Sequence, residues 1–429
     1  MTTVNLRFLA YLWSLLFGVG IVGLASCEGP TTQARGLWAG NPERIAEELP
    51  PRDTVAPPPV TATIAAVGDL MCSYRQFRIA KVGDHQFDFF PSYQMIRPLL
   101  AGADLTIGNL ETNIGGAGQA YRGFPRFNTP DDYLEPLREA GFDLLFTSNN
   151  HSMDLGEAGI RRTIRKLDEL GIAHTGTYRD AGDRARVRIV DVKGIRIGFL
   201  SYTSTTNGIK GPRGKGYLVN YVDFQQLPRD IAAARAQGAE VVLTYFHFGT
   251  QYSTQPNFWQ ERVVKAAIAG GADMILGSHP HVVQPVRFFK TENARLDSGV
   301  ICFSLGNFLS NEFRRRADAG VVLHLKLTKD PVRDSIYLDG VDFVPTWTYR
   351  GTHPSLRRHV ILPAEWGFGD HDFTFLGARD KARMREAFAD TRAVLTRETD
   401  QIRVRGMNPE PEDFREGDRP GVDAELYAE

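Results

Sequence analysis

Two histidines separated by a single proline are the residues whose types and spacing most directly predict chemistry in this chain. They are His279 and His281, within the segment Ser278-His279-Pro280-His281. A residue that precedes proline is biased toward extended backbone, and residues i and i+2 of an extended segment point to the same side. We therefore expect both imidazoles to converge on one point. Paired imidazoles commonly bind zinc, iron or manganese.

Other polar residues directly follow apolar segments that predict strands. The ends of such strands are where open α/β sheets hold their ligand sites. Two carboxylates, an amide oxygen and three imidazoles form a set suited to a pair of divalent cations. Such cations carry four positive charges and the carboxylates offset two, so the site would attract anionic oxygens. The residues of this set are Asp69, Glu111, Asn150, His247, His279 and His281.

Apolar segments that predict strands alternate with segments that predict helices, which is typical of an α/β domain with parallel pairing in its first part. Helices are expected over residues 133–140 and 157–170, and a peripheral amphipathic helix over residues 380–403. The expected strands cover residues 61–67, 104–107, 142–146, 196–202, 240–246, 273–276, 299–304, 321–327 and 336–344.

Six short motifs occur in a fixed order along these segments. They are Gly68-Asp69, Gly108-Asn109-Leu110-Glu111, Asn149-Asn150-His151 with Asp154 and Gly156, His247 with Gly249, Gly277 to Pro285, and Ser304-Leu305-Gly306-Asn307-Phe308. In this order the chain resembles the CapA family of capsule, or poly-γ-glutamate, biosynthesis proteins, which are related to calcineurin-like metallophosphoesterases. The resemblance covers about residues 61–345. It implies a four-layer α-β-β-α sandwich of two mixed sheets with helices on both outer faces.

The resemblance also implies a role for each matching residue. Asp69 and His281 would bind a first metal ion, and Glu111 would bridge to a second ion. That second ion would be bound by the side chains of Asn150, His247 and His279. His151 would donate a hydrogen bond to a substrate oxygen or act as a general acid. The implied cofactor is one or two divalent ions of manganese, iron or zinc.

One position departs from the wider phosphoesterase superfamily, which has Asp-x-His at the first motif. This chain has Met71 in place of that histidine, and a thioether does not replace imidazole on a hard cation. The first metal site is therefore short of one ligand.

Four further residues are candidate contacts to the substrate or to the metal ligands: Asn109, Asn149, Asp154 and Asn307. Asp154 either orients the ring of His151 or caps the following helix. Asn149 either supports the site or closes the turn before Asn150, and Asn307 either donates to substrate or stabilises a turn.

The first part of the chain predicts a bacterial lipoprotein. Residues 1–26 have the apolar segment of a signal peptide, and Leu24-Ala25-Ser26-Cys27 matches a lipobox, so Cys27 is the expected lipidation site. Residues 27–60 then form a proline-rich linker, residues 61–365 the CapA-like, metallophosphoesterase-like domain, and residues 366–429 a peripheral helix and a disordered acidic tail. We expect a protein of the cell envelope, anchored in the membrane by lipid on the extracytoplasmic side, in the periplasm or at the cell surface.

The composition limits the classes of partner that we expect for this protein. The net charge of −1 and the lack of a basic stripe argue against nucleic acid. Cys72 and Cys302 are expected as buried free thiols, although sequence alone also allows a disulfide between them. The expected partners are an anionic polymer or a phosphate ester as substrate, and other capsule-assembly proteins.

Three hypotheses about function remain open at this point. The first is metal-assisted hydrolysis or transfer during assembly of a capsule polymer. The second is a periplasmic phosphoesterase that uses the same ligands. The third is a non-catalytic scaffold or polymer-binding subunit, which the methionine at position 71 favours.

Overall fold

The structure is a computed structural model that describes residues 57–406 apart from 292, 294, 295, 297, 352, 354, 355, 357 and 370–372. These residues belong to the compact unit that begins at Ala56. The expected signal peptide, the lipidation site Cys27, most of the linker and the acidic tail from residue 407 onward lie outside the described residues.

The first sheet has nine strands in the order β16-β15-β14-β1-β4-β5-β6, with β13 paired to β1 and β17 paired to β15. Strands β1, β4, β5 and β6 pair in parallel with their neighbours. On the other side of β1, strands β14, β15 and β16 pair antiparallel. The strands are β1 (Val60–Leu70), β4 (Leu105–Leu110), β5 (Leu144–Phe146), β6 (Ala173–Thr175), β13 (Asn307–Leu309), β14 (Ala319–Asp330), β15 (Ser335–Arg350), β16 (His359–Pro363) and β17 (Arg403–Val404).

The second sheet has six strands in the order β11-β12-β10-β9-β8-β7, parallel from β12 to β8 and antiparallel at both edges. These strands are β7 (Arg188–Val192), β8 (Ile195–Thr203), β9 (Val241–His247), β10 (Met274–Ser278), β11 (Val283–Lys290) and β12 (Ser298–Leu305). A separate two-stranded ribbon joins β2 (Lys81–Gly83) to β3 (Gln86–Phe87). Every strand expected from the sequence is present within a few residues.

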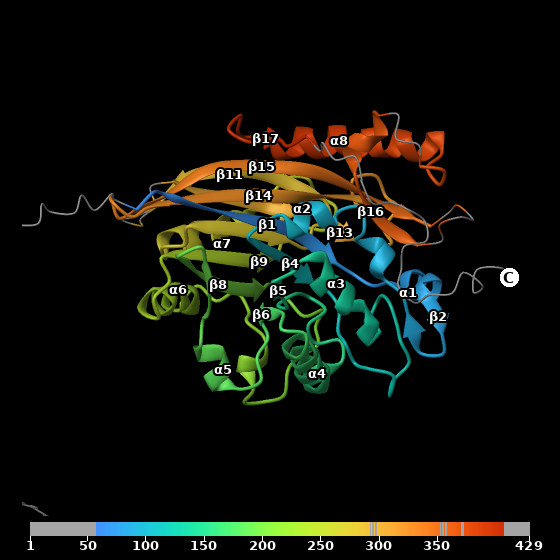
Figure 1. Ribbon diagram of the computed structural model, residues 1–429. Coiled ribbons are helices and arrows are strands. Elements are labelled where there is room, and N and C mark those ends of the chain that lie inside the picture. Colours follow the sequence, from blue (N-terminus) through green and yellow to red (C-terminus); the bar gives the residue numbers. More distant parts are fainter. Residues whose placement is uncertain are drawn as a thin grey trace, which may run out of the picture. The chain divides into compact units, whose positions relative to one another are not determined.

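The two sheets pack face to face, and helices cover their outer faces (Figure 1). The core between the sheets includes Ile64, Ile107, Phe199, Leu243 and Leu276. The outer face of the first sheet packs against α1 (Tyr74–Ala80), α2 (Arg97–Ala101) and α3 (Glu135–Ala140), and that of the second against α6 (Gln226–Ala236) and α7 (Phe258–Ala269). The four-layer α-β-β-α arrangement is therefore confirmed.

The remaining helices connect strands at the rim of the sandwich. α4 (Gly156–Glu169) lies against β6, and α5 (Ala181–Ala185) precedes β7. Short 3₁₀ turns are η1 (Phe90–Ser92), η2 (Asp131–Tyr133), η3 (Gly216–Leu218) and η4 (Ala364–Gly367). None of the helices in the described part of the chain has the length and apolar character needed to span a bilayer.

The helix expected over residues 380–403 is shorter than predicted. α8 (Ala378–Leu395) ends eight residues earlier and lies along β15 (Figure 1). Ile402, which extended the apolar spacing of the helix, is buried in the core between the sheets, and the two residues after it form β17 beside β15. Strand pairing rather than a longer helix therefore buries this apolar side chain.

Both cysteines of the described residues are buried free thiols. The expectation for Cys72 and Cys302 is confirmed, and no disulfide joins the two sheets.

Candidate metal centre

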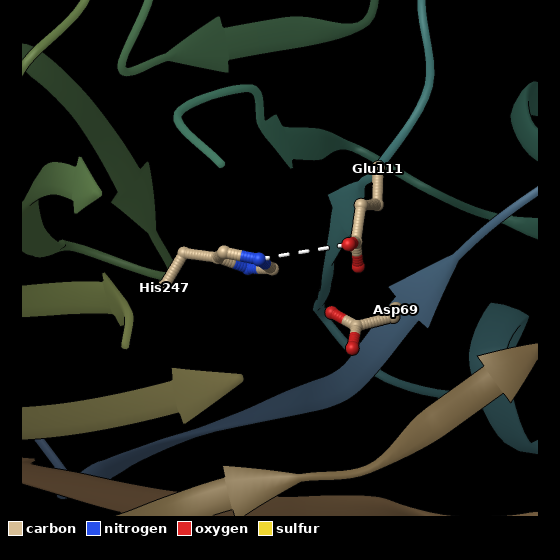
Figure 2. Close-up of side chains that lie close together, drawn as sticks. All are labelled: Asp69, Glu111 and His247. Atoms are coloured by element: carbon tan, nitrogen blue, oxygen red, sulfur yellow. Dashed lines mark ion pairs between the residues drawn. The ribbon is translucent and has the colours of Figure 1, made fainter. Parts of the chain in front are cut away.

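Strand ends from both sheets meet at one buried point, which Figure 2 shows. Asp69 lies near the end of β1, Glu111 follows β4, and His247 is the last residue of β9. One ligand atom from each residue lies within 4.8 Å of the others, and all three side chains are buried. The structure thus brings together three predicted ligands that are far apart in sequence.

Two glycines allow β1 to approach the turn after β12 closely enough to place Asp69. The backbone N–H of Asp69 donates to the carbonyl oxygen of Gly306 at 2.9 Å. A Cβ atom on Gly68 would lie 1.8 Å from that same oxygen, so no larger residue fits. Gly306 itself has φ of +69°, a left-handed conformation that glycine adopts without a steric penalty. Close packing at the site therefore accounts for both glycines.

The carboxylate of Glu111 lies unpartnered in this buried point. Neither of its oxygens has a hydrogen-bond partner among the described residues. The nearest imidazole nitrogens are Nε2 of His247 at 3.6 Å and Nε2 of His281 at 3.9 Å. Burial raises the pKa of Glu111 well above its ordinary value, and the neighbouring Asp69 raises it further. A buried carboxylate without a partner is costly, and a cation beside it would remove that cost.

Three of the predicted ligand atoms crowd around one spot next to Glu111. Nε2 of His247 lies 2.8 Å from Oδ1 of Asn150 and 3.1 Å from Nδ1 of His279. Both separations are those of hydrogen bonds. Ligand atoms about 2.1 Å from one ion at tetrahedral angles are about 3.4 Å apart, so a small outward shift would let these atoms share an ion. Burial lowers the pKa of His247 well below its ordinary value and that of His279 to about 4, and a nearby imidazole adds to each effect. Both rings are therefore neutral near pH 7, the form that binds metals.

Asp69 and His281 form a neighbouring group whose polar atoms already have protein partners. Nδ2 of Asn109 donates to Oδ1 of Asp69 at 2.7 Å, and the hydroxyl of Ser278 donates to the same oxygen. Nδ1 of His281 lies 3.0 Å from Oδ2 of Asp69 and 3.0 Å from Oδ1 of Asn307. An ion bound here would share Asp69 with these hydrogen bonds.

Charge pairing within this group fixes its protonation. Burial alone would raise the pKa of Asp69, but the hydrogen bond and charge of His281 hold it below its ordinary value. Burial likewise opposes the charged form of His281, yet Asp69 raises its pKa. Because Nδ1 of His281 faces two acceptors, it carries a proton, and Nε2 is the ring nitrogen directed toward Glu111.

The backbone around Pro280 is not extended, so the sequence-based expectation was wrong. His279 has φ of +96° and His281 has φ of +57°, and a non-glycine residue at positive φ costs on the order of 1–3 kcal/mol. Tertiary contacts hold this conformation, among them a 2.7 Å bond from the N–H of Tyr252 to the Pro280 carbonyl. The two ring centroids lie 6.1 Å apart, and the ring of His279 contacts His247 whereas that of His281 contacts Asp69.

His151 is oriented by Asp154. Nδ1 of His151 lies 2.8 Å from Oδ2 of Asp154, and that oxygen also accepts the backbone N–H of Phe127 at 2.7 Å. The ring of Phe127 packs edge-on against the imidazole, with centroids 4.6 Å apart. The residue at the N-cap of α4 is Leu155, so Asp154 does not cap that helix. Of the two interpretations of Asp154, the structure favours orientation of His151.

Asn149 ties the loop after β5 to the end of β4. Its Nδ2 donates to Oδ1 of Asn109 at 3.1 Å and to the carbonyl of Leu110 at 2.8 Å, and its Oδ1 accepts the N–H of His151 at 3.1 Å. Asn113 adds a 2.5 Å bond to the His151 carbonyl. These amides fix His151 relative to the strand that ends before Glu111, which combines the two roles considered for Asn149.

Asn307 acts inside the protein. Besides contacting His281, its Nδ2 donates to the carbonyl of Ala317 at 2.8 Å. Both ends of the amide are therefore used to hold a turn and an imidazole, which favours the turn-stabilising interpretation. Met71 lies half-buried beyond Asp69, and its backbone N–H donates to the carbonyl of Leu309 at 2.8 Å.

Sequence reasoning missed a loop that lines this region. Gln284 donates to the carbonyls of Ser253 and Gln255 at 2.9 and 3.0 Å, and thereby holds the loop after β9. The same loop carries Tyr252, whose ring centroid lies 6.1 Å from that of His281. The available signal was the position of this loop directly after a predicted strand that ends in a candidate ligand.

The four-layer sandwich and the buried acid and imidazole side chains at its strand ends define the class, an α/β protein with a candidate divalent-metal site. The orphaned carboxylate of Glu111 and the crowded ligand atoms beside it fit such an ion. Residues 63–312 match the family described as "Bacterial capsule synthesis protein PGA_cap". The chain belongs to this family.

Named relatives agree with this membership. The chain is 27% identical over 289 residues to the "Capsule biosynthesis protein CapA" of Bacillus anthracis, a match that covers 65% of this chain and 67% of that protein. It is 26% identical over 302 residues to the "PGA biosynthesis protein CapA" of Bacillus subtilis, covering 68% of this chain and 73% of that protein.

Two solved structures match this chain at low similarity. The NAD nucleotidase NadN of Haemophilus influenzae matches with a TM-score of 0.43 at 12% identity, covering 81% of this chain, and this chain spans 64% of that protein. The calcineurin-like phosphoesterase YfkN of Bacillus subtilis matches with a TM-score of 0.39 at 14% identity, covering 78% of this chain and 98% of that one.

Proposed function

We propose that this protein acts in the biosynthesis of a capsule or poly-γ-glutamate exopolymer, by metal-assisted hydrolysis or transfer at the site around Glu111. The single observation that carries the metal-dependent part is the buried carboxylate of Glu111. It has no hydrogen-bond partner among the described residues and lies 3.6 Å from an imidazole nitrogen of His247 and 3.9 Å from one of His281. Family membership and the names of the relatives support a role with this polymer.

The ion would be held by Glu111 together with the neutral imidazoles of His247 and His279 and the amide oxygen of Asn150. When bound, a divalent ion supplies Lewis-acid stabilisation of negative charge on a reacting oxygen. Asp69 and His281 would support the same centre or a second ion.

Proton transfer is assigned to His151. Asp154 engages Nδ1 of this ring, and Phe127 packs against it in a T-shaped arrangement, so the ring has a defined orientation. Nε2 is then the nitrogen that donates to a leaving-group oxygen, which is worth roughly 10²–10⁴ in rate for a positioned general acid.

We also propose that the chain is anchored at the cell envelope through lipid on Cys27, with the domain on the extracytoplasmic side. The lipobox that ends in Cys27 and the proline-rich residues 28–60 support this arrangement. An anionic polymer or a phosphate ester would be the substrate, and other capsule-assembly proteins would be partners.

The test is complementation of a deletion strain in a host that makes a surface polymer. Deletion should reduce the amount or change the chain length of the polymer, and the wild-type gene should restore it, whereas Glu111→Gln and His151→Gln should not. Restoration by both variants at normal protein levels would point to the scaffold alternative. An unchanged polymer in the deletion strain would refute the role in polymer biosynthesis.

A further inference from the structure

Three consecutive arginines occupy the loop between β13 and β14, and they differ in what they contact. Arg315 makes a two-pronged ion pair with Asp390 of α8, with N···O distances of 2.7 and 3.0 Å, and Arg316 approaches the same carboxylate at 3.3 Å. Arg314 is exposed and makes no ion pair with the residues that the structure describes. One guanidinium of the three thus keeps its charge available.

Arg314 is turned toward the metal centre instead. Its guanidinium carbon lies 4.4 Å from the ring centroid of Tyr252, and that ring lies 6.1 Å from the ring of His281. The N–H of Tyr252 is bonded to the carbonyl of Pro280, between the two histidines. A positive charge is therefore held one aromatic ring away from a predicted metal ligand.

The loop that carries Arg314 is fixed at the end that leads into β14. The Ala317 carbonyl accepts a bond from Asn307 at 2.8 Å. The buried carboxylate of Asp318 accepts bonds from Arg383 of α8 at 2.7 Å and from the indole of Trp347 at 3.0 Å. Together with the pairs to Asp390, these contacts reduce the freedom that Arg314 would lose on binding a ligand.

Stacking on an aromatic ring uses the face of a guanidinium and leaves its in-plane N–H groups directed outward. These N–H groups match the paired oxygens of a carboxylate or a phosphate. Glu312, an acid in the same loop, faces the hydroxyl end of Tyr252, where burial and the charge of Glu312 raise the pKa of that tyrosine. The geometry therefore fits an anionic ligand that extends from the metal centre over Tyr252.

We propose that Arg314 binds an anionic group of the substrate adjacent to the group that reacts at the metal centre. The site would thereby select substrates that carry a carboxylate or phosphate next to the bond that is broken or transferred. This inference rests on the proposed function of the same centre and adds a residue that determines its specificity.

The experiment uses the full chain with Arg314→Gln, Arg314→Lys and the neighbouring control Arg315→Lys, which keeps a cation beside Asp390. Binding of a soluble poly-γ-glutamate oligomer and of inorganic phosphate is measured by calorimetry at low and high salt. Bound metal is measured on each sample. Arg314→Gln should weaken binding of one probe roughly tenfold or more, with a smaller loss for Arg314→Lys and a change within about twofold for the control.

A loss confined to the oligomer would identify a carboxylate as the ligand, and a loss confined to phosphate would identify a phosphate ester. The inference is overturned if Arg314→Gln binds both probes like wild type, or if Arg315→Lys loses as much affinity. All variants should retain the wild-type metal content. Wild-type protein without metal would contradict the proposed function itself, whatever the arginine variants show.

Discussion

Replacing Glu111 by glutamine should abolish the stabilisation of the protein by divalent metal while leaving the metal-free fold intact. The substitution keeps the shape of the side chain and removes a buried acid whose oxygens have no hydrogen-bond partner among the described residues. Without metal, Glu111 of the unfolded chain loses its proton near the ordinary pKa of 4.5. In the folded protein Glu111 keeps its proton to higher pH, because burial raises its pKa. Wild-type stability without metal should therefore fall as pH rises above about 4.5, by at most roughly 1.4 kcal/mol per pH unit, and the glutamine variant should lack this fall.

The size of the metal effect follows from mass action. Free metal at a hundred times its dissociation constant stabilises the folded state by about 2.7 kcal/mol. For a folded body of roughly 350 residues, the unfolding entropy is about 0.7 kcal/mol per kelvin, so wild type should gain about 4 °C in Tm. If loss of the charged ligand weakens binding a hundredfold, the variant gains only about 0.6 °C at the same concentration.

Thermal unfolding is measured with and without manganese, iron or zinc at fixed pH. Asp273→Asn serves as the matched control, because Asp273 is a fully buried acid at the opposite end of β10 with partners of its own. The control should lose stability but keep the metal-induced shift. An equal shift in Glu111→Gln and wild type would refute the assignment of Glu111 as a ligand.

Three further predictions concern stability and catalysis. Burial, together with nearby arginines, lowers the pKa of His359 to about 3. Between about pH 3 and 6.5 the unfolded chain therefore binds more protons than the folded protein. The free energy of unfolding should fall on acidification through that window, by about 2 kcal/mol between pH 6.5 and 5. Urea titrations at several pH values should show that His359→Gln weakens this pH dependence, whereas the exposed His85→Asn does not. An equal pH dependence of the free energy of unfolding in wild type and both variants would contradict the prediction. Asp318→Asn should lower the free energy of unfolding by about 1–2 kcal/mol, because it removes a buried acceptor charge, and an unchanged urea midpoint would contradict this. Asp154→Asn should lower kcat on a hydrolysed substrate roughly 10²-fold with little change in KM or metal content and an altered pH profile, whereas wild-type kcat would exclude a role in orienting the general acid.

The ends of the parallel strands were predictable from the sequence. Apolar runs followed directly by Asp69, Glu111 or His247 mark strand ends, and parallel strands present those ends at one edge of a sheet. The alternation of strands and helices predicted the class of the fold, and the resemblance to the CapA family implied its layers. Local sequence patterns were enough to predict these strands, because each strand buries the apolar residues of its own segment.

The backbone of the histidine segment was not predictable in the same way. The preference of a residue before proline for extended backbone is weak, and tertiary bonds such as that from Tyr252 to Pro280 outweigh it at His279. The end of α8 was missed for a related reason, since Ile402 has apolar spacing that fits a helix but is buried after a change of direction into β17.

Contacts between distant segments were beyond the sequence as well. Arg315 and Asp390 are 75 residues apart, and nothing in their local composition distinguishes them from solvated charges. Asn307 likewise could be placed in a turn, but not opposite His281. These contacts depend on how the two sheets and α8 pack.

The central claim is that the buried cluster around Glu111 binds metal, and elemental mass spectrometry of the purified chain lacking residues 1–27 tests it most directly. After loading with manganese, iron and zinc in turn and removal of free metal, wild type should retain one or two ions per chain. Glu111→Gln and His279→Ala should lose at least one of them, while Asp273→Asn should retain the wild-type number. Wild-type protein that retains no ion under any of the three loadings would contradict the account.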